Sequence, residues 1–328
     1  MPEKGHAVVR HPRMYPPPSG AQYEITHGDQ RATVVEVGGA LREYVVGGRH
    51  VLDGFAVEDQ ADGGRGQPLL PWPNRILDGQ YEFGEQRLQL PIEEVERHNA
   101  IHGLTRWQAW TLVEHAPRRA RLGFTIHPRT GYPFTLELAL DYALDANGLQ
   151  VRTTARNAGA GPLPFGAGQH PYLSVGTPRV DDALLQVSAG SRLEMDPERL
   201  VPTGVSVHTA GTPYDFRVPR LIGDSVLDAC YADLARDDTG KARVTLSDPA
   251  SGRSATLWMG SRYRFAQVFT GDTLAPDKRR RGLAVEPMTC PPDAFRTGAD
   301  LIVLRPGDSI MLEWGITTAP DTAVREAP

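Results

Sequence analysis

The sequence is poor in cysteine, which narrows the classes of protein it can belong to. Its 328 residues include only two cysteines, Cys230 and Cys290, too few for the disulfide framework of a small secreted protein. We therefore expect a reducing, cytoplasmic location. No group of cysteine and histidine residues has metal-ligand spacing, so the sequence does not predict a structural zinc site.

Long apolar runs and an excess of basic residues are also missing. No stretch of 18 apolar residues occurs, so we expect no membrane span. The chain has 35 Lys and Arg residues against 40 Asp and Glu residues, whereas surfaces that bind nucleic acid are normally basic. Residues 1–20 are polar, rich in proline and without the apolar region of a secretory signal, so we interpret them as a flexible tail. Residues 320–328 are interpreted as a second tail.

Glycine and proline are abundant and scattered along the chain. The 34 glycines and 28 prolines break it into short segments in which apolar and polar residues alternate, the pattern of β-strands with one buried face. A hairpin is predicted from 134–144 and 149–156, joined at Asp145–Gly148, and another from 81–83 and 88–90. Residues 21–319 are therefore predicted to form a single all-β domain, a large antiparallel sandwich with few short helices.

Two later segments carry weaker predictions. Leu301–Leu304 and Ser309–Ile316 flank Pro306–Gly307, which favours a closing hairpin. The apolar residues of Leu221–Leu234 fit a helical period as well as a loop, so both interpretations stay open there.

His170 lies in the most unusual stretch of the chain, Phe165–Tyr172. Pro171 biases His170 toward an extended conformation, and Gly166 and Gly168 allow the backbone to turn sharply or to approach another group closely. Histidine is the side chain best suited to exchange a proton near neutral pH. His170 is therefore a candidate acid or base, and the alternative is a core histidine beneath a turn.

Glu286 ends a short apolar run and is followed at once by proline. This places a carboxylate at the end of a strand among apolar neighbours, where burial can tune its proton affinity. The alternative is a solvated acid at a strand end.

Several other residues are candidates for binding an oxygen-rich ligand. Arg75 offers permanently charged donors, and His102 is either a ligand contact or a core imidazole. Trp72, Trp107 and Tyr172 could each present a flat apolar face to the C–H surface of a sugar, although aromatic residues more often pack in cores.

Lys278–Arg281 is a run of four basic residues in a polar segment. A solvated loop tip is the favoured interpretation, because runs of like charge are usually exposed. The other interpretation is a phosphate-binding group that reaches a phosphorylated sugar.

Six motifs, taken in order, resemble the aldose 1-epimerase (mutarotase) family over about residues 23–318. They are Pro71–Ile76, Asn99–Gly103, Gly168–Tyr172, Leu227–Tyr231, Gln267–Gly271 and Glu286–Thr289. The resemblance implies a galactose-mutarotase-like β-supersandwich that interconverts the α and β anomers of a free aldose without a metal or an organic cofactor. The residues after Glu286 resemble bacterial branches of the family, so a preference for galactose is not carried over.

The resemblance also implies roles for individual residues. The general acid falls on His170 and the general base on Glu286. The residues implied to bind the sugar are Asn74, Arg75, His102, Tyr172, Asp228 and Gln267. We expect the partner to be a small-molecule sugar, and the protein to be a monomer or homodimer that binds neither nucleic acid nor membrane.

Two alternatives remain beside a free-aldose epimerase. One is a hexose-phosphate 1-epimerase, of the glucose-6-phosphate type, which would use the basic run. The other is a non-catalytic carbohydrate-binding protein of the same fold, which would not need both His170 and Glu286. A glycosidase would usually require two facing carboxylates, and only Glu286 and Asp228 are eligible.

Overall fold

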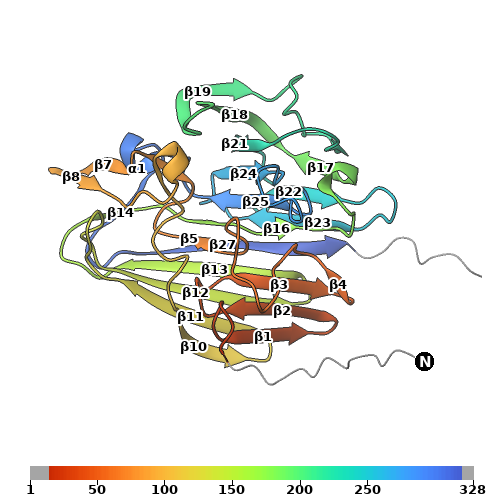
Figure 1. Cartoon of the computed structure of the whole chain (residues 1–328), viewed down its shortest axis with the longest axis horizontal. Helices are drawn as coiled ribbons and strands as arrows, with labels where there is room; N and C mark the ends of the chain where they lie inside the picture. Colours follow the sequence, from red (N-terminus) through yellow and green to blue (C-terminus); the bar gives the residue numbers. More distant parts are fainter. Residues whose placement is uncertain (1–14, 320–328) are drawn as a thin grey trace, which may run out of the picture.

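The computed structural model describes residues 15–319. Within this range the chain forms antiparallel sheets stacked into a sandwich, with very little helix (Figure 1). The predicted all-β class is thereby confirmed. Of the two predicted tails, residues 1–14 and 320–328 lie outside the described residues.

The largest sheet has nine strands. In spatial order they are β10 (Thr111–Ala116), β11 (Arg119–Ile126), β12 (Leu136–Asp145), β13 (Gly148–Asn157), β27 (Ser309–Ala319), β23 (Ser254–Met259), β22 (Ala242–Ser247), β17 (Leu184–Val187) and β20 (Arg220–Leu221). The predicted hairpin of β12 and β13 is present, with Asp145 opposite Gly148 at its turn. Leu149, Val151 and Thr153 of β13 all face the core, as the alternation of apolar residues predicts.

The second large sheet has eight strands and includes Glu286 of the candidate site. Its strands in spatial order are β19 (Pro202–His208), β18 (Ala189–Met195), β21 (Asp228–Leu234), β24 (Phe265–Phe269), β25 (Leu283–Met288), β15 (Gly168–Gln169) and β5 (Pro68–Leu69), with β16 (Tyr172–Leu173) also paired to β25. All six residues of β25 are buried, because this strand has neighbours on both edges and packed residues on both faces.

Smaller elements complete the described part of the chain. A four-stranded sheet contains β1 (Gln22–His27), β2 (Gln30–Val35), β3 (Leu41–Val46) and β4 (Arg49–His50). The two-stranded sheets are β6 (Arg75–Leu77) with β9 (Asn99–Ile101), β7 (Gln80–Phe83) with β8 (Gln86–Gln89), and β14 (Leu163–Phe165) with β26 (Ile302–Leu304). The helical elements are α1 (Ala294–Thr297) and the 3₁₀ turns Val95–Arg97 and Val180–Asp182.

The prediction of a closing hairpin is wrong. β26 pairs with β14, whereas β27 pairs with β13 and β23 in the nine-stranded sheet. The turn at Pro306–Gly307 therefore carries the chain from one sheet to another, because each strand finds its partner among distant segments.

The ambiguous segment 221–234 contains strands. Residues 229–232 of β21 are all buried, so the strand lacks the alternation of a half-exposed strand, and its pattern resembles a buried helix. Pairing with β24 and β18 in the eight-stranded sheet decides its conformation. Among residues 15–319, no helix has the length and apolar character needed to cross a bilayer.

Candidate active site

His170 and Glu286 meet because of the register between three short strands. Gly168 of β15 pairs with Met288 of β25, and Tyr172 of β16 pairs with Ala284 of the same strand. Position 170 therefore falls opposite position 286, in the gap between β15 and β16. Pro171 lies in this gap, and a proline interrupts strand pairing because it has no N–H to donate.

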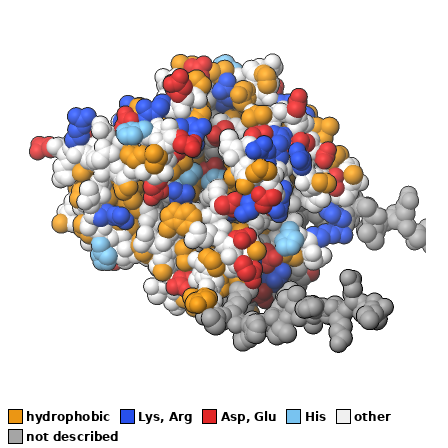
Figure 2. Space-filling view, in the orientation of Figure 1, with side chains coloured by type: hydrophobic (Ala, Val, Ile, Leu, Met, Phe, Trp, Pro, Cys, Tyr) orange, Lys and Arg blue, Asp and Glu red, His pale blue; other side chains and the backbone are white. Residues whose placement is uncertain are grey.

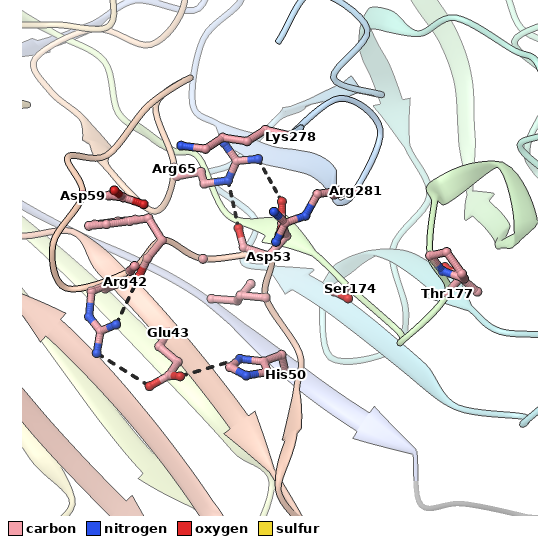
Figure 3. A pocket seen from close by; sticks show the side chains of 15 residues that line it. Arg42, Glu43, His50, Asp53, Asp59, Arg65, Ser174, Thr177, Lys278 and Arg281 are labelled. Atoms are coloured by element: carbon pink, nitrogen blue, oxygen red, sulfur yellow. Dashed lines mark hydrogen bonds and ion pairs between the residues drawn. The ribbon is translucent and has the colours of Figure 1, made fainter. Parts of the chain in front are cut away.

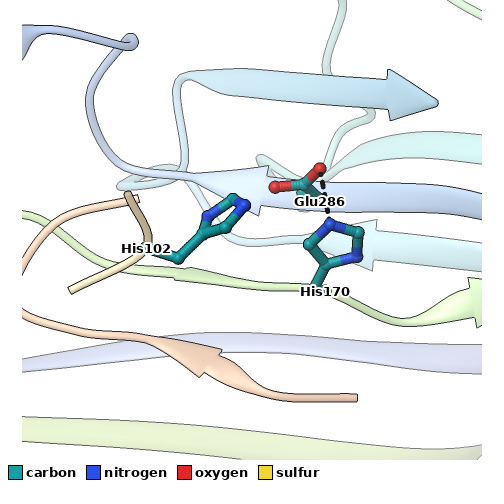
Figure 4. A group of neighbouring side chains, drawn as sticks. All are labelled: His102, His170 and Glu286. Atoms are coloured by element: carbon teal, nitrogen blue, oxygen red, sulfur yellow. Dashed lines mark ion pairs between the residues drawn. The ribbon is translucent and has the colours of Figure 1, made fainter. Parts of the chain in front are cut away.

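The two side chains are in contact and buried. Nε2 of His170 lies 3.3 Å from Oε1 of Glu286, and the side chains are 6% and 3% exposed. Figure 4 shows the imidazole of His170 pointing at the carboxylate, with the ring of His102 beside them. The backbone of His170 is held by Gln67, whose carbonyl accepts from the His170 N–H at 3.0 Å. Both candidate catalytic groups are therefore in one place.

Neighbouring strands add two of the predicted sugar-binding residues. Gln267 of β24 is the cross-strand partner of Glu286, and its amide nitrogen donates to the carboxylate of Asp228 on β21. Asp228 lines the cavity next to Glu286, but Gln267 is buried and does not. Gln267 therefore holds the carboxylate of Asp228 from behind.

A second pair of strands supplies Asn74, Arg75 and His102. β6 pairs with β9, with Arg75 opposite Ile101, so Asn74 and His102 are the next opposed positions. The N–H of His102 donates to the carbonyl of Asn74 at 2.9 Å, and the N–H of Asn74 donates to Nδ1 of His102 at 3.2 Å. These reciprocal bonds fix the His102 ring toward the cavity.

The bond from Asn74 also determines what His102 can do. Burial, together with the nearby charge of Arg106, lowers the pKa of His102 well below its usual value, so the ring is neutral. Because Nδ1 accepts a hydrogen bond, the single proton resides on Nε2. The trio His102, His170 and Glu286 has potential metal-ligand atoms within 4.8 Å of one another. However, a protonated Nε2 has no lone pair for a metal and is instead a donor to a hydroxyl oxygen.

Burial shifts both His170 and Glu286 toward their uncharged forms. It lowers the pKa of His170 to about 3, with Arg106, Arg65 and Arg75 adding to the effect. It raises the pKa of Glu286 well above its usual value, further raised by Asp228 and opposed by Arg75. These opposite shifts arise because a charge loses hydration in the interior, and such perturbed groups are frequent in active sites.

His170, Glu286 and His102 line a cavity of about 460 Å³, a size suited to a small-molecule ligand. Figure 2 shows histidine atoms at the base of a hollow near the middle of this face, with acidic and basic side chains around it. Asn74, Arg75 and Asp228 also line the cavity. Six of the eight predicted site residues therefore share it.

Tyr172 lies behind His170 instead of in the cavity. The two rings stack with centroids 5.0 Å apart, and the Tyr172 hydroxyl donates to the carbonyl of Gly63 at 2.8 Å. On its other side the guanidinium carbon of Arg65 lies 4.5 Å from the tyrosine ring centroid. This stack supports the orientation of the His170 ring.

The loop before β5 forms a wall that the sequence analysis did not assign to the site. Residues Gln60–Gly64 line the cavity, and a Cβ at Gly64 would lie 2.8 Å from Cδ2 of His170. Gly63 and Gly64 have positive φ angles of 54° and 76°, a conformation that glycine adopts without strain. The adjacent glycines at 63 and 64 were the available signal for a close backbone approach.

The basic run Lys278–Arg281 turns out to be tied into ion pairs. Arg280 is buried and bonds Asp181 and Asp272, so the prediction of a solvated tip is wrong for this residue. Lys278 lies 3.4 Å from Asp62, and Arg281 lies 2.8 Å from Asp53. Figure 3 shows Arg65 and Arg281 converging on Asp53 in a separate pocket, which neither His170 nor Glu286 lines. None of residues 278–281 lines the cavity of His170 and Glu286.

The chain is similar to known proteins over most of its length. Residues 21–317 match the family model described as aldose 1-epimerase. The chain belongs to the aldose 1-epimerase family. It is 35% identical to the uncharacterized protein YihR of Escherichia coli K12, over 88% of this chain and 90% of that protein.

Named relatives include the galactose mutarotase of Mus musculus, 25% identical over 72% of this chain and 73% of that protein. The maltose epimerase of Levilactobacillus brevis is 28% identical over 66% of this chain and 68% of that protein. The crystal structure of a GalM/aldose epimerase homologue from C. elegans superimposes with a TM-score of 0.81 at 19% identity, covering 92% of this chain and 99% of that one. The family member described here is thus an isomerase that acts on carbohydrates, with the galactose-mutarotase-like fold.

Proposed function

We propose that the protein interconverts the α and β anomers of a free aldose by opening and closing the sugar ring, with His170 and Glu286 as acid and base. The observation that carries the proposal is the contact of 3.3 Å between Nε2 of His170 and Oε1 of Glu286 at the base of a sugar-sized cavity. The two oxygens that exchange protons in a hemiacetal, O1 and the ring oxygen, are bonded to the same carbon. An acid and a base that serve both oxygens must therefore lie close together.

Ring opening requires two proton transfers. Ionised Glu286 takes the proton of the C1 hydroxyl, and protonated His170 gives a proton to the ring oxygen as its bond to C1 breaks. The product is an open-chain aldehyde, which rotates about the C1–C2 bond and closes by the reverse transfers. A positioned acid or base contributes about 10²–10⁴-fold to a rate.

The pair keeps the same number of protons through the cycle. Opening converts ionised Glu286 and protonated His170 into a neutral carboxyl group and a neutral imidazole, and closing converts them back. Burial favours the uncharged form through the lowered pKa of His170 and the raised pKa of Glu286. That form performs ring closing, since the carboxyl group can protonate the aldehyde oxygen while the imidazole accepts the proton of the ring hydroxyl.

The remaining cavity residues offer hydrogen bonds of both kinds to sugar hydroxyls. His102 donates through Nε2, and Asp228 accepts. One edge of the Arg75 guanidinium is held by Glu94, with Nε at 2.9 Å and Nη2 at 3.0 Å from its carboxylate oxygens. A guanidinium fixed in this way binds a hydroxyl with little further loss of side-chain freedom.

The charges around the cavity favour an unphosphorylated sugar. Arg75, Arg97 and Arg106 line it together with the carboxylates of Asp62 and Asp228, and each of the three arginines already has an acidic partner. Glu94 and Glu93 further neutralise the arginines. A phosphate dianion would need uncompensated cationic donors. The names of the two enzymes cited above also refer to unphosphorylated sugars.

Anomer exchange measured by one-dimensional NMR across a panel of free aldoses tests the proposal. We expect acceleration with at least one free hexose or pentose, and a slower reaction with glucose 6-phosphate than with glucose. A panel without any accelerated sugar would contradict the proposed reaction. Faster exchange of the phosphorylated sugar would instead favour the hexose-phosphate epimerase.

A further inference from the structure

Asp293 immediately precedes α1, a position where the side chain of an aspartate usually bonds an N–H group of its own helix. The side chain of Asp293 makes no such bond. It is buried, and its Oδ1 accepts a hydrogen bond from the N–H of Leu77, 216 positions away in the sequence, at 3.0 Å. The N–H of Asp293 also donates to the carbonyl of Arg75 at 2.6 Å. Asp293 therefore binds β6 on both sides of Ile76, through its backbone and through its side chain.

The segment that carries Asp293 is anchored near the candidate base. Asp293 lies seven positions after Glu286 in the sequence. Between them, the N–H of Thr289 donates to the carbonyl of Ala167 at 2.9 Å, and the N–H of Ala167 donates to the hydroxyl of Thr289 at 2.9 Å. The two prolines at 291–292 then restrict the backbone, because proline fixes φ. The chain between Glu286 and Asp293 is therefore held in place.

Phe295 anchors the same segment on its other side. Its ring is buried, and its centroid lies 5.5 Å from that of Trp72 and 5.1 Å from that of Tyr81. Trp72 precedes β6 in the chain, and Tyr81 lies on β7, which follows β6. Tilted aromatic pairs of this kind are stabilising. Asp293 is thus fixed between two anchors when it binds β6.

Arg75 lies on a different sheet from the candidate base. β6 and β9 form a two-stranded sheet outside the eight-stranded sheet that contains Glu286, so pairing within the larger sheet does not set the position of Arg75. Glu94 holds the guanidinium of Arg75. The backbone of Glu94 bonds that of Asn99 on β9, so Glu94 belongs to the same small sheet as Arg75. Asp293 connects this small sheet to the segment of Glu286.

We propose that Asp293 is a positioning residue, which places Arg75 relative to Glu286 and thereby supports binding of the sugar. The inference rests on the proposed function, because it takes Arg75 as a contact of the sugar. A binding group misplaced by about 1 Å can cost up to about 10²-fold in rate. Arg75 exchanges no proton with the sugar in the proposed reaction, so its displacement raises KM more than it lowers kcat.

The test measures KM and kcat by NMR for glucose, galactose, xylose and arabinose in variants of the full-length protein. Asp293 has a positive φ of 66°, which glycine and asparagine tolerate. Asp293→Gly removes the side chain and should raise KM by about tenfold, with kcat changed by less than about threefold. Asp293→Asn keeps an oxygen for the N–H of Leu77 and should restore a KM within about twofold of the wild-type value.

Two further variants show whether the effect passes through Arg75. Arg296→Met removes a 43% exposed partner of Oδ2 of Asp293 and leaves Oδ1 in place, so KM should be unchanged. In an Arg75→Met protein, Asp293→Gly should raise KM little further, because coupled residues have non-additive effects. An equal rise of KM in the presence and absence of Arg75 would overturn the positioning role.

Hydrogen exchange of the Leu77 amide tests the connection without any sugar. Exchange should be faster in Asp293→Gly than in the wild type and in Asp293→Asn, and an unchanged rate in Asp293→Gly would contradict the inference. If the glycine variant does not fold in a urea titration, Asp293→Ser, which shortens the side chain, should show the same changes. A wild-type protein that exchanges no aldose contradicts the proposed function, whereas normal turnover with an unchanged KM in Asp293→Gly overturns only the role of Asp293.

Discussion

Two buried pairs, each made of a basic and an acidic side chain, differ in how their polar atoms are hydrogen-bonded. The side chains of Arg65 and Asp53 are 2% and 6% exposed, and those of His170 and Glu286 are 6% and 3% exposed. Burial is therefore nearly the same. Arg65 makes hydrogen bonds through all three nitrogens, to Asp53 and Asp62. By contrast, Oε2 of Glu286 is buried without a hydrogen-bond partner among residues 15–319.

The difference separates a pair whose hydrogen bonds are all made within the protein from the pair that we propose as acid and base. Native structures satisfy nearly all their buried polar atoms, so an unsatisfied atom requires an explanation. Arg65 makes its hydrogen bonds to groups of the protein itself and stays charged. Burial alone would lower the pKa of Arg65, but its contacts with Asp53 and Asp62 outweigh this effect and raise the pKa. In the His170 pair, Oε2 of Glu286 and Nδ1 of His170 are buried without a hydrogen-bond partner among the described residues.

Glu286→Gln should have the largest effect on activity. The amide is isosteric but cannot take a proton, so we expect the rate of anomer exchange to fall by about 10²–10⁴-fold. Binding of the sugar, measured by calorimetry, should persist. Glu137→Gln, at an exposed residue on β12, is the matched control and should retain full activity. A Glu286→Gln protein with near-normal turnover would contradict the proposed base.

Arg65→Met should have the largest effect on stability. It leaves the carboxylate of Asp53 buried with one fewer partner, and breaking a buried pair costs about 3–5 kcal/mol. The free energy of unfolding in urea measures the loss. Arg281→Met removes the other partner of Asp53. The side chain of Arg281 is 52% exposed, and an exposed pair contributes only about 0–1 kcal/mol. Equal losses of unfolding free energy in the two variants would show that the burial of Arg65 does not increase its contribution to stability.

The pH dependence of kcat/KM should be bell-shaped, because the pair works only with a fixed number of protons. At low pH an added proton leaves the pair without a proton acceptor. At high pH the loss of a proton leaves it without a proton donor. In the uncharged pair the added proton goes to His170, whose pKa is about 3, and the lost proton comes from Glu286, whose pKa is raised. The limbs report the pair as a unit.

The acidic limb should therefore lie below the usual pKa of histidine, and the alkaline limb above the usual pKa of glutamate. Beyond each limb, the rate should fall about tenfold per pH unit. NMR exchange rates from about pH 2 to about pH 10 cover both limbs, and the free energy of unfolding at each pH separates loss of activity from loss of fold. A flat profile over that range would exclude acid–base catalysis by this pair.

Gly64→Ala should have the smallest effect, a few-fold loss of kcat. Its Cβ would lie 2.8 Å from His170 and displace the ring, and the positive φ of 76° adds strain of about 1–2 kcal/mol for a residue other than glycine. Gly84→Ala is the control, because it has a positive φ of 61° and open space around its Cβ. The control should lose stability but keep its kcat; an equal loss of kcat in both variants would contradict the role of Gly64.

The sequence predicted the elements that depend on local patterns. The hairpin of β12 and β13 has a turn motif between two alternating segments, and both signals agree. The interpretation of 301–316 as a hairpin failed because a turn motif does not specify whether the flanking strands pair with each other. The strand β21 was ambiguous because a strand buried on both faces has no alternation to read.

The candidate site likewise contains residues that local patterns indicate and residues whose positions depend on contacts between distant segments. His170, Glu286 and Arg75 were identifiable because their residue types and proline-rich surroundings indicate chemistry at strand ends, together with the family resemblance. The positions of Tyr172 and Gln267 behind the cavity were not predictable, since a local motif does not say which side of a sheet faces a ligand. The Gln60–Gly64 wall was missed because its role depends on contact with a distant segment.

By itself the sequence determined the fold class and the family and pointed to His170 and Glu286 as candidates, because composition, alternation and motif order are properties of the chain. Only the tertiary structure decided that His170 lies opposite Glu286, through the pairing of β15 and β16 with β25. It also decided that Oε2 of Glu286 is buried without a hydrogen-bond partner among the described residues. The physical reason is that register and burial arise from contacts between segments far apart in the chain, which no local pattern encodes.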